Sequence, residues 1–278
     1  MIDCHPWLSC QDINRLNIGD LIGYGAVKHI YQSTWNNVNV ALVFVNNREY
    51  IEDFMHGLRM LRELGPSEFI VQLVGFCTEE EVYVTEYHPL GNALNFHKIF
   101  PDTSVSLGKK FQFCIRYVEI IEYLHNSPAG KRVMCDSNSL NKILEQYLIT
   151  TTHSLVVNDV DALPEVNGSG IVCGHKELNG DFVAPEQRWP HQGEPFVEDE
   201  MKLYDEKVDV WKIPPVCNYF LGYCEAAGVF KYYLLPVHEK CRQHNPHSRP
   251  TATDILTDYK KYYKEYFLDE EMKERDEL

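Results

Sequence analysis

The hydrophobic period of the sequence changes part-way along the chain, and this change limits the possible folds more than any single motif. The first part contains short β-prone runs, at 18–21, 27–35, 38–45, 70–77 and 82–86. One helical pattern, at 50–64, interrupts them, and helical spacing dominates from residue 107 onward. Strands gathered at one end and helices at the other predict an α+β fold with segregated parts.

The bulk composition fits one large, two-lobed domain. The 278 residues are 44% hydrophobic, which is enough for a sizeable core. We expect a single domain over 1–278, with a small β-rich N-lobe over about 1–87, a hinge over about 87–91 and a mainly helical C-lobe over about 92–278. The net charge of −15 argues against nucleic acid as a partner. No stretch approaches the ~20 apolar residues needed to span a bilayer.

The nine cysteines are scattered and form no Cys-x-x-Cys pair, so a zinc site is a poor explanation for them. Composition alone leaves buried thiols and disulfides as open alternatives. Two features favour a secretory-pathway lumen. Residues 167–169 (Asn-Gly-Ser) form an acceptor sequon for N-glycosylation, and the chain ends in Arg-Asp-Glu-Leu at 275–278, close to an endoplasmic reticulum retention signal.

Several segments resemble protein-kinase motifs and come in the order in which kinases carry them. Gly23-x-Gly25-x-x-Lys28 resembles a phosphate-covering loop, because glycines let the backbone approach phosphates closely. The run 40–43 (Val-Ala-Leu-Val) resembles the Val-Ala-Ile-Lys strand, with Val43 in place of the lysine. Further matches lie in the carboxyl half, at 133–136 (Val-Met-Cys-Asp), 184–186 (Ala-Pro-Glu), 204–211 and 245–252. The ordered set predicts a bilobal protein-kinase-like fold.

Three residues of these segments are expected to support the fold and not the chemistry. The resemblance predicts a buried ion pair between Glu186 and Arg249. It also predicts that Asp209 caps backbone amides of the catalytic loop. An inactive relative would keep all three, so they do not bear on activity.

The chemistry of phosphoryl transfer needs a carboxylate that orients the acceptor hydroxyl and oxygen ligands for a divalent cation. Asp136 is the predicted catalytic carboxylate. Asp159 is the predicted metal ligand, with Asp161 as the alternative, and Asn141 is the second ligand, with Asn138 as its alternative. The expected cofactors are ATP and Mg²⁺, with Mn²⁺ possible. The expected nucleotide-binding residues are Gly23, Gly25, Lys28, Ala41, Glu86, Tyr87 and His88.

The vacant lysine position is the main difficulty for an active enzyme. Lys28 stands at the third glycine position of the phosphate-covering loop, from which an ammonium can reach phosphates, so we predict that it is the catalytic lysine. The alternative is that Lys28 is an ordinary solvated lysine. Its usual glutamate partner is also missing, because Gly57 falls at that position, and Glu52 or Asp53 one turn earlier are the possible substitutes.

The activation segment shows no phosphorylation device. The arginine that normally pairs with a phosphorylated residue is replaced by Cys135. Between Asp161 and Ala184 the only hydroxyl residue is Ser169, which belongs to the sequon. We therefore predict that the activation segment is constitutively ordered and that phosphatase treatment leaves the activity of the protein unchanged.

The chain resembles the protein O-mannose kinase family over essentially its whole length. The segments that carry the resemblance are 6–10, 25–28, 85–91, 132–138 and 180–187, among which Met-Cys-Asp-Ser-Asn at 134–138 is unusual for kinases. The resemblance implies a single-pass type II membrane protein of the endoplasmic reticulum with a lumenal kinase domain, of which this chain is a soluble and monomeric portion. It implies transfer of the ATP γ-phosphate to the 6-hydroxyl of mannose in the GalNAc-GlcNAc-Man trisaccharide of α-dystroglycan.

One alternative function stays open beside this interpretation. A catalytically dead pseudokinase, acting as a nucleotide-binding or scaffolding module, is favoured by the replacements at Val43, Met134 and Cys135. The residues that would hold the sugars are not evident. Trp189 and Tyr204 are candidate stacking platforms, although core packing explains them equally well.

Overall fold

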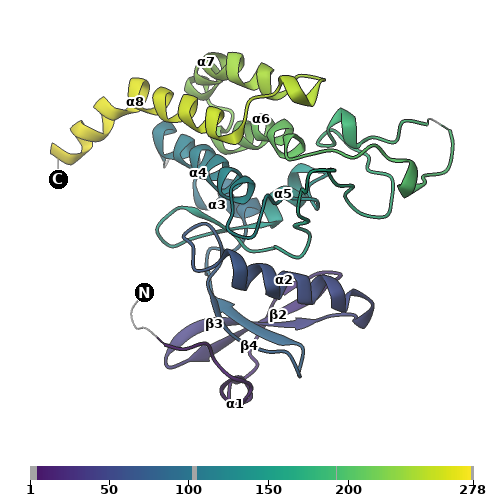
Figure 1. The fold of residues 1–278 in the computed structure, drawn as a ribbon. Helices are drawn as coiled ribbons and strands as arrows, with labels where there is room; N and C mark the ends of the chain where they lie inside the picture. Colours follow the sequence, from purple (N-terminus) through teal and green to yellow (C-terminus); the bar gives the residue numbers. More distant parts are fainter. Residues whose placement is uncertain (1–4, 102–104, 192, 277–278) are drawn as a thin grey trace. The chain divides into compact units, whose positions relative to one another are not determined.

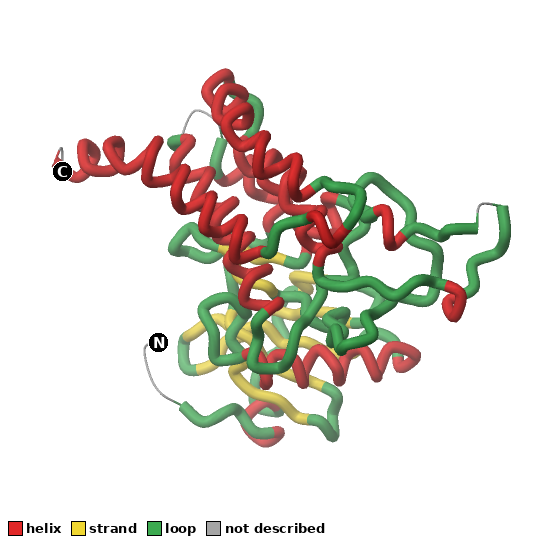
Figure 2. The backbone as a smooth tube through the Cα atoms, turned by 45° about the horizontal axis from the view of Figure 1, so that its top comes forward, coloured by secondary structure: helices red, strands yellow, loops and turns green. Residues whose placement is uncertain are grey.

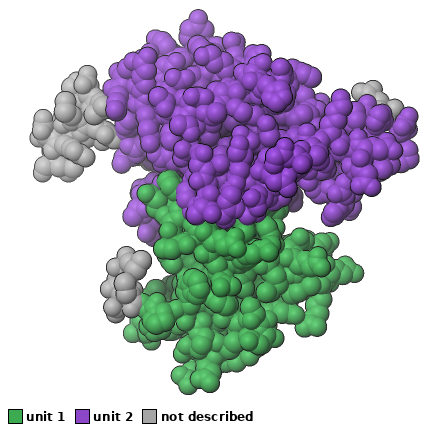
Figure 3. Space-filling view, in the orientation of Figure 1, with its two compact units in different colours: residues 1–89, 156–163 green, residues 90–155, 164–278 purple. Residues whose placement is uncertain are grey.

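The computed structural model describes residues 5–101, 105–191 and 193–276. Cys4, Glu277 and Leu278, which entered the predictions above, lie outside these ranges. The chain forms two compact units, 1–89 with 156–163 and 90–155 with 164–278 (Figure 3). The boundary between residues 89 and 90 falls inside the predicted hinge. Residues 156–163, which the prediction assigned to the C-lobe, belong instead to the first unit.

Backbone hydrogen bonds explain why this segment joins the first unit. The Val71 amide donates to the Val157 carbonyl, and the Val157 amide donates to the Phe69 carbonyl, both at 2.8 Å. Val157 ends β7 (Leu155–Val157). The residues that follow β7 are therefore held on the first unit, where the candidate metal ligands Asp159 and Asp161 lie.

The first unit is built on an antiparallel sheet of five strands in the order β1-β2-β3-β5-β4 (Figure 1). Their bounds are β1 (Leu21–Tyr24), β2 (Lys28–Trp35), β3 (Val38–Val45), β4 (Leu73–Cys77) and β5 (Val82–Glu86). The prediction of β3 and β5 is confirmed to the residue, whereas β1 starts three residues later than predicted. The unit also contains α1 (Cys10–Ile13) and α2 (Ile51–Leu64).

Alternating side chains divide the sheet into two buried faces. Val40, Leu42 and Val84 belong to a cluster with Leu8 and Ile13, so the amino-terminal segment covers that face. The intervening residues point the other way, toward α2, whose Phe54 ring lies 5.1 Å from that of Tyr83 on β5. Both faces are thus covered, and the face under α2 is the one that carries the candidate site.

The second unit is mainly helical (Figure 2). Its helices are α3 (Phe96–Ile99), α4 (Leu107–His125), α5 (Leu140–Glu145), α6 (Lys207–Leu221), α7 (Glu225–Cys241) and α8 (Ala252–Asp276). Helix α4 packs against both α6 and α8, and Phe111 of α4 contacts the rings of Phe230 and Tyr259. In the described part of the chain, no helix combines the length and the apolar character that crossing a membrane requires.

The helical spacing that dominates from residue 107 onward is interrupted in this unit. Helix α5 ends at Glu145, and Tyr147–Ile149 forms strand β6. Tyr147 and Ile149 are buried, and the Ile149 amide donates to the Gly91 carbonyl at 2.9 Å. Tertiary packing therefore overrides the helical spacing at this point.

Candidate active site

Lys28 lies on the sheet face where a kinase carries its strand lysine. In the register of the sheet Lys28 pairs with Val45 and Ile30 with Val43. Cross-strand partners point to the same face, as do residues two apart on a strand. Lys28 and Val43 therefore share one face, on which Tyr83, the β5 partner of Val43, also lies. An ammonium from β2 can thus replace one from β3.

The Lys28 ammonium is buried and paired with two carboxylates. Its Nζ lies 2.5 Å from Asp159 Oδ1 and 3.3 Å from Asp161 Oδ2. The lysine side chain is only 9% exposed, and those of Asp159 and Asp161 are 26% and 12% exposed. These values exclude the alternative of an ordinary solvated lysine. The structure brings together Lys28, Asp159 and Asp161, which the sequence had predicted separately.

Charge interactions within this cluster set its protonation. Burial disfavours the ammonium form of Lys28, but attraction to Asp159, with support from Tyr83 and Asp161, raises its pKa above the usual range. Burial also opposes ionisation of Asp159, yet the Lys28 ammonium lowers the pKa of that carboxyl. For Asp161, burial raises the pKa to about 7, and repulsion by Asp159 adds to the effect. Asp159 is therefore the more strongly ionised of the two carboxyls.

Gly57 on α2 makes room for Asp161. A Cβ at Gly57 would lie 3.2 Å from Asp161 Cβ and 3.4 Å from its Cα, closer than side-chain carbons normally approach. This position is where a kinase carries the glutamate that pairs with its lysine. Glu52 and Asp53, the predicted substitutes, lie exposed in the first turn of α2. In the described ion pairs of Lys28 the carboxylates come instead from Asp159 and Asp161.

The donor set of this cluster fits a divalent cation. Carboxylate oxygens are the ligands that Mg²⁺ and Mn²⁺ prefer, and Asp159 and Asp161 present theirs beside one ammonium. Either aspartate can coordinate the metal here. The predicted partners Asn138 and Asn141 lie in the second unit, the first half-buried and the second exposed on α5, and their role stays a prediction.

The remaining nucleotide-binding candidates lie on the first unit with Lys28. The Gly25 amide donates to the Lys28 carbonyl at 2.8 Å, which closes the turn between β1 and β2. A Cβ at Gly23 would meet the Ile30 side chain at 3.1 Å. Ala41 is buried in β3 opposite Thr85. The Glu86 carboxylate accepts from the Gln72 amide at 2.9 Å and lies 3.3 Å from His88 Nε2, and Tyr87 stands between them in sequence.

Asp136 belongs to a second cluster, on the second unit. Lys142 Nζ donates to both carboxylate oxygens of Asp136, at 2.9 and 3.0 Å. Gln146 Nε2 donates to Asp136 Oδ2 at 3.3 Å and to its backbone carbonyl at 3.2 Å. Sequence reasoning identified Asp136 but missed Lys142 and Gln146. Gln146 lies directly before strand β6, which the sequence did not predict, so no sequence signal pointed to it.

The catalytic loop rests on a buried polar network. The Met134 amide donates to Asp209 Oδ2 at 3.1 Å, which confirms the predicted cap. Lys212, one turn further along α6, donates to Ser137 Oγ and lies 3.5 Å from Asp209 Oδ1. Burial lowers the pKa of Lys212, although Asp209 opposes the effect. The bonds from Met134 to Asp209 and from Lys212 to Ser137 tie the loop that carries Asp136 to helix α6.

A disulfide joins the catalytic loop to the activation segment. Cys135, at the position of the missing arginine, is bonded to Cys173, and a second disulfide links Cys10 to Cys77 in the first unit. Cys114, Cys217 and Cys241 are buried free thiols and Cys224 is a half-buried one, so both alternatives left open by composition occur together. Pairing by Cys135 supports an activation segment that is ordered without phosphorylation.

Two further contacts anchor that segment. Arg249 forms a bidentate ion pair with Glu186, at 2.5 and 2.8 Å, and its side chain is fully buried, as predicted. Trp189 and Tyr204 are buried in a core cluster with Cys173, and the Cys173 amide donates to the Tyr204 hydroxyl. Core packing therefore explains these two aromatic residues, and the structure offers no support for them as sugar platforms.

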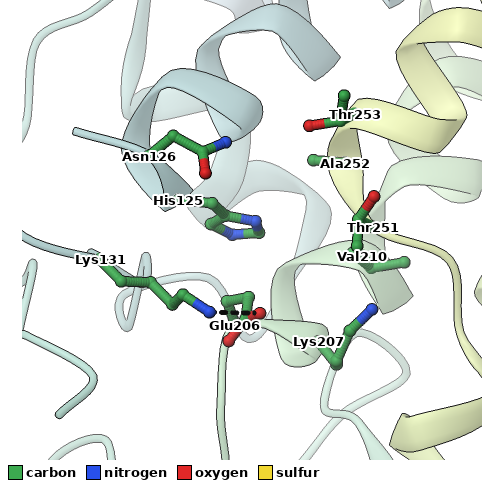
Figure 4. Close-up of a pocket in the computed structure, with 9 residues that line it drawn as sticks. All are labelled: His125, Asn126, Lys131, Glu206, Lys207, Val210, Thr251, Ala252 and Thr253. Atoms are coloured by element: carbon green, nitrogen blue, oxygen red, sulfur yellow. Dashed lines mark hydrogen bonds and ion pairs between the residues drawn. The ribbon is translucent and has the colours of Figure 1, made fainter.

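A separate polar pocket of about 140 Å³ lies in the second unit (Figure 4). It is lined from the end of α4 and the starts of α6 and α8, and it contains the 2.7 Å ion pair between Lys131 and Glu206. Its wall includes His125, whose Nε2 lies 3.2 Å from Asp209 Oδ2. None of the predicted catalytic, nucleotide-binding or metal-binding residues lines this pocket.

Comparison with known proteins agrees with the geometry. Residues 16–156 match the family described as protein tyrosine and serine/threonine kinase. The protein O-mannose kinase of Homo sapiens is 43% identical over 276 residues, covering 94% of this chain and 77% of the relative. The chain belongs to the protein O-mannose kinase family. The Gallus gallus and Xenopus laevis members are 45% and 41% identical over 268 residues, covering 93% of this chain and 76% of each relative.

Membership in this family identifies the class of enzyme. The chain is a kinase with a β-sheet N-lobe and a helical C-lobe, a transferase that uses ATP. The assignment of Lys28, Asp159 and Asp161 to the phosphates and the metal, and of Asp136 to the acceptor hydroxyl, stays a prediction.

Proposed function

We propose that this kinase transfers the γ-phosphoryl group of ATP to the 6-hydroxyl of an O-linked mannose. The curated relatives are named for O-mannose. The single structural observation that carries the proposal is the buried Lys28 ammonium, 2.5 Å from Asp159. It lies on the same sheet face as Val43, which stands where kinases carry their strand lysine. It supplies the cation that a pseudokinase would lack.

Each residue has a distinct part in the reaction. Lys28 holds the non-transferred phosphates, and Asp159 with Asp161 would hold a divalent cation, Mg²⁺ or Mn²⁺. That cation, when bound, neutralises charge on the phosphates. Asp136 orients the mannose hydroxyl and accepts its proton as the oxygen attacks phosphorus. The backbone of Glu86–His88 is the proposed adenine contact, since β5 ends there.

The acceptor in this proposal is the GalNAc-GlcNAc-Man trisaccharide on α-dystroglycan. It is tested by transfer from γ-labelled ATP to the synthetic trisaccharide, with and without its terminal sugar. We expect Asp136→Asn and Lys28→Met each to lower transfer on the order of 10²–10³-fold. Lys176→Met, at an exposed lysine of the second unit, is the matched control and should leave the rate unchanged. Equal signal from the intact chain and Asp136→Asn would make the chain a pseudokinase.

Nucleotide binding is tested apart from transfer. ATP with Mg²⁺ at about a hundred times its Kd should stabilise the fold by about 2.7 kcal/mol, and Lys28→Met should remove most of this gain. Binding without transfer would support the alternative of a nucleotide-binding module. If the chain neither binds ATP nor transfers phosphate, the result would support a scaffold.

The proposal extends to the compartment, the lumen of the endoplasmic reticulum, with the full-length protein held as a type II membrane protein. Two disulfides and an exposed sequon asparagine, Asn167, support an oxidising lumen. In cells that express the protein, glycosidase treatment should shift its mobility, and Asn167→Gln should abolish the shift. An unglycosylated chain with reduced cysteines would contradict this location.

A further inference from the structure

Tyr83 places a buried hydroxyl beside the candidate catalytic lysine. In the register of the sheet Ile30 pairs with Val43, and Val43 pairs with Tyr83. Lys28 stands two residues from Ile30, so these four residues share one face. From Lys28 to Tyr83 the sheet spans two strand spacings of about 4.8 Å and one two-residue step of about 6.6 Å. A lysine and a tyrosine side chain together cover this diagonal.

The surroundings of Tyr83 keep its hydroxyl in the interior of the first unit. The residue is 3% exposed, and the Phe54 ring of α2 lies 5.1 Å from its ring. A buried phenol hydroxyl needs a hydrogen-bond partner. Here the Lys28 ammonium donates to the Tyr83 oxygen. Burial raises the pKa of Tyr83 to about 12, so the hydroxyl stays neutral at physiological pH.

The Lys28 ammonium has three N–H donors, and three acceptors lie beside it. Two of them are the carboxylates of Asp159 and Asp161, at 2.5 and 3.3 Å, and the third is the Tyr83 hydroxyl. Both carboxylates are also the proposed metal ligands, so neither is reserved for the lysine. Of these three partners, the hydroxyl is the one that has no second task in the proposed reaction.

We propose that Tyr83 is a positioning residue, whose hydroxyl holds the Lys28 ammonium for the phosphates in place of the glutamate that is missing at Gly57. The inference rests on the proposed function, since it assumes that Lys28 binds the phosphates of ATP. A hydroxyl differs from a glutamate in one respect that matters here. It fixes the position of the ammonium without neutralising it, so the full charge of Lys28 remains for the phosphates.

A neutral anchor fits the charges and the space of this cluster. Asp159 and Asp161 already bring two carboxylates to one ammonium. A third carboxylate at Gly57 would add repulsion, and its Cβ alone would crowd Asp161. Hydrogen bonds from charged donors are stronger than those between neutral groups. A single hydroxyl can therefore restrain a lysine stem that has several rotatable bonds.

The experiment compares Tyr83→Phe with the matched control Tyr31→Phe. Tyr31 pairs with Leu42 on the other face of the same sheet, so the control removes the same kind of hydroxyl away from Lys28. Tyr83→Phe keeps the ring that packs on α2 and should leave the unfolding midpoint unaltered. We expect it to raise the Kd of ADP with Mg²⁺, measured by calorimetry, about tenfold, and to leave the Kd of adenosine unchanged. Tyr31→Phe should change neither Kd.

A second comparison shows whether Tyr83 acts through Lys28. In a Lys28→Met background, Tyr83→Phe should change the Kd of ADP by less than about twofold, because the group that it positions is gone. A further tenfold loss in that background would overturn the inference. An unchanged Kd of ADP in Tyr83→Phe alone, or equal weakening of ADP and adenosine, would also overturn it. These binding measurements need no acceptor, whereas lack of transfer by the unaltered chain would refute the proposed function, so the two failures are distinct.

Discussion

Two glycine-to-alanine substitutions, each inside a helix, should have opposite effects. Gly57 lies in α2 and Gly228 in α7. Alanine is favoured over glycine by about 1 kcal/mol in a helix interior. A Cβ at Gly228 would meet no atom within 4 Å, so Gly228→Ala should gain about that amount.

At Gly57 the same gain is opposed by a steric clash. The new Cβ would lie 3.2 Å from Asp161 Cβ and 3.6 Å from its amide nitrogen, so main-chain atoms as well as the side chain must yield. Val160 and Leu163 on either side of Asp161 are each 1% exposed, which leaves the segment little room to move. Overpacking of this kind costs about 1–3 kcal/mol. Gly57→Ala should therefore be between neutral and about 2 kcal/mol less stable.

The functional effect should exceed the effect on stability. Displacing Asp161 by a few tenths of an ångström disturbs its 3.3 Å pairing with Lys28, and misplaced catalytic groups lose rate steeply. We expect the transfer rate of Gly57→Ala to fall about tenfold, and that of Gly228→Ala to stay unchanged. Urea unfolding and initial rates measure both quantities. An equal stability gain in the two variants, with normal rates, would refute the close packing of α2 on Asp161.

Three further outcomes follow from single contacts. Replacing Cys135 and Cys173 by serine removes a cross-link across 38 residues and should lower the free energy of unfolding by about 4 kcal/mol on the chain-entropy relation. The transfer activity should fall as well. Phosphatase treatment of the unaltered chain should leave its activity unchanged. Arg249→Met strands the carboxylate of Glu186, half of an ion pair whose arginine is fully buried, and should cost about 3–5 kcal/mol in urea unfolding. Burial raises the pKa of Asp161 from 3.8 to about 7, so its protonated form stabilises the metal-free fold fully below about pH 4. That contribution is lost as pH rises through about 7, and Asp161→Asn should abolish this part of the pH slope.

Two matched variants serve as controls for these measurements. Cys224→Ser removes a half-buried thiol outside both disulfides and should change neither stability nor rate. Arg48→Met breaks a pair with Glu81 in which the arginine is 84% exposed, and should cost at most about 1 kcal/mol. Similar losses from Arg48→Met and Arg249→Met would contradict the role assigned to burial.

Local patterns predicted the sheet and most helices, because hydrophobic spacing and turn residues act over a few positions. β3 and β5 followed from their β-prone residues alone. The long-range pair of Glu186 and Arg249 also came from sequence, but only through resemblance to kinase motifs. No spacing rule connects positions 63 residues apart.

The partners of Lys28 could not be predicted in the same way. Asp159 lies 131 residues further along the chain, and its approach depends on backbone bonds that hold the segment after β7 on the first unit. Sequence reasoning looked for the second carboxylate on α2, where kinases carry it. It did not consider that Gly57 leaves space for Asp161 to enter from another segment.

Helix α5, which follows the loop with Asp136, obscured the partners of that carboxylate. The five-residue spacing from Asp136 drew attention to Asn141, which α5 places on its exposed side. Since α5 lies between the loop and β6, the residue directly before the strand is Gln146, and it is Gln146 that contacts Asp136. Whether Asn141 binds metal stays a prediction.

The energetics of Lys28 argue against a chain that has merely lost its activity. Burying an ammonium and two carboxylates costs several kcal/mol per ion, and apolar side chains of similar volume at such sites are often more stabilising. The neighbouring Val43 shows that this face accepts apolar residues. A scaffold with no use for the charges would be more stable with apolar residues of similar volume at Lys28, Asp159 and Asp161. The triple variant Lys28→Met, Asp159→Leu and Asp161→Leu should therefore be at least as stable as the unaltered chain and inactive, and a marked loss of stability would remove this argument for a functional site.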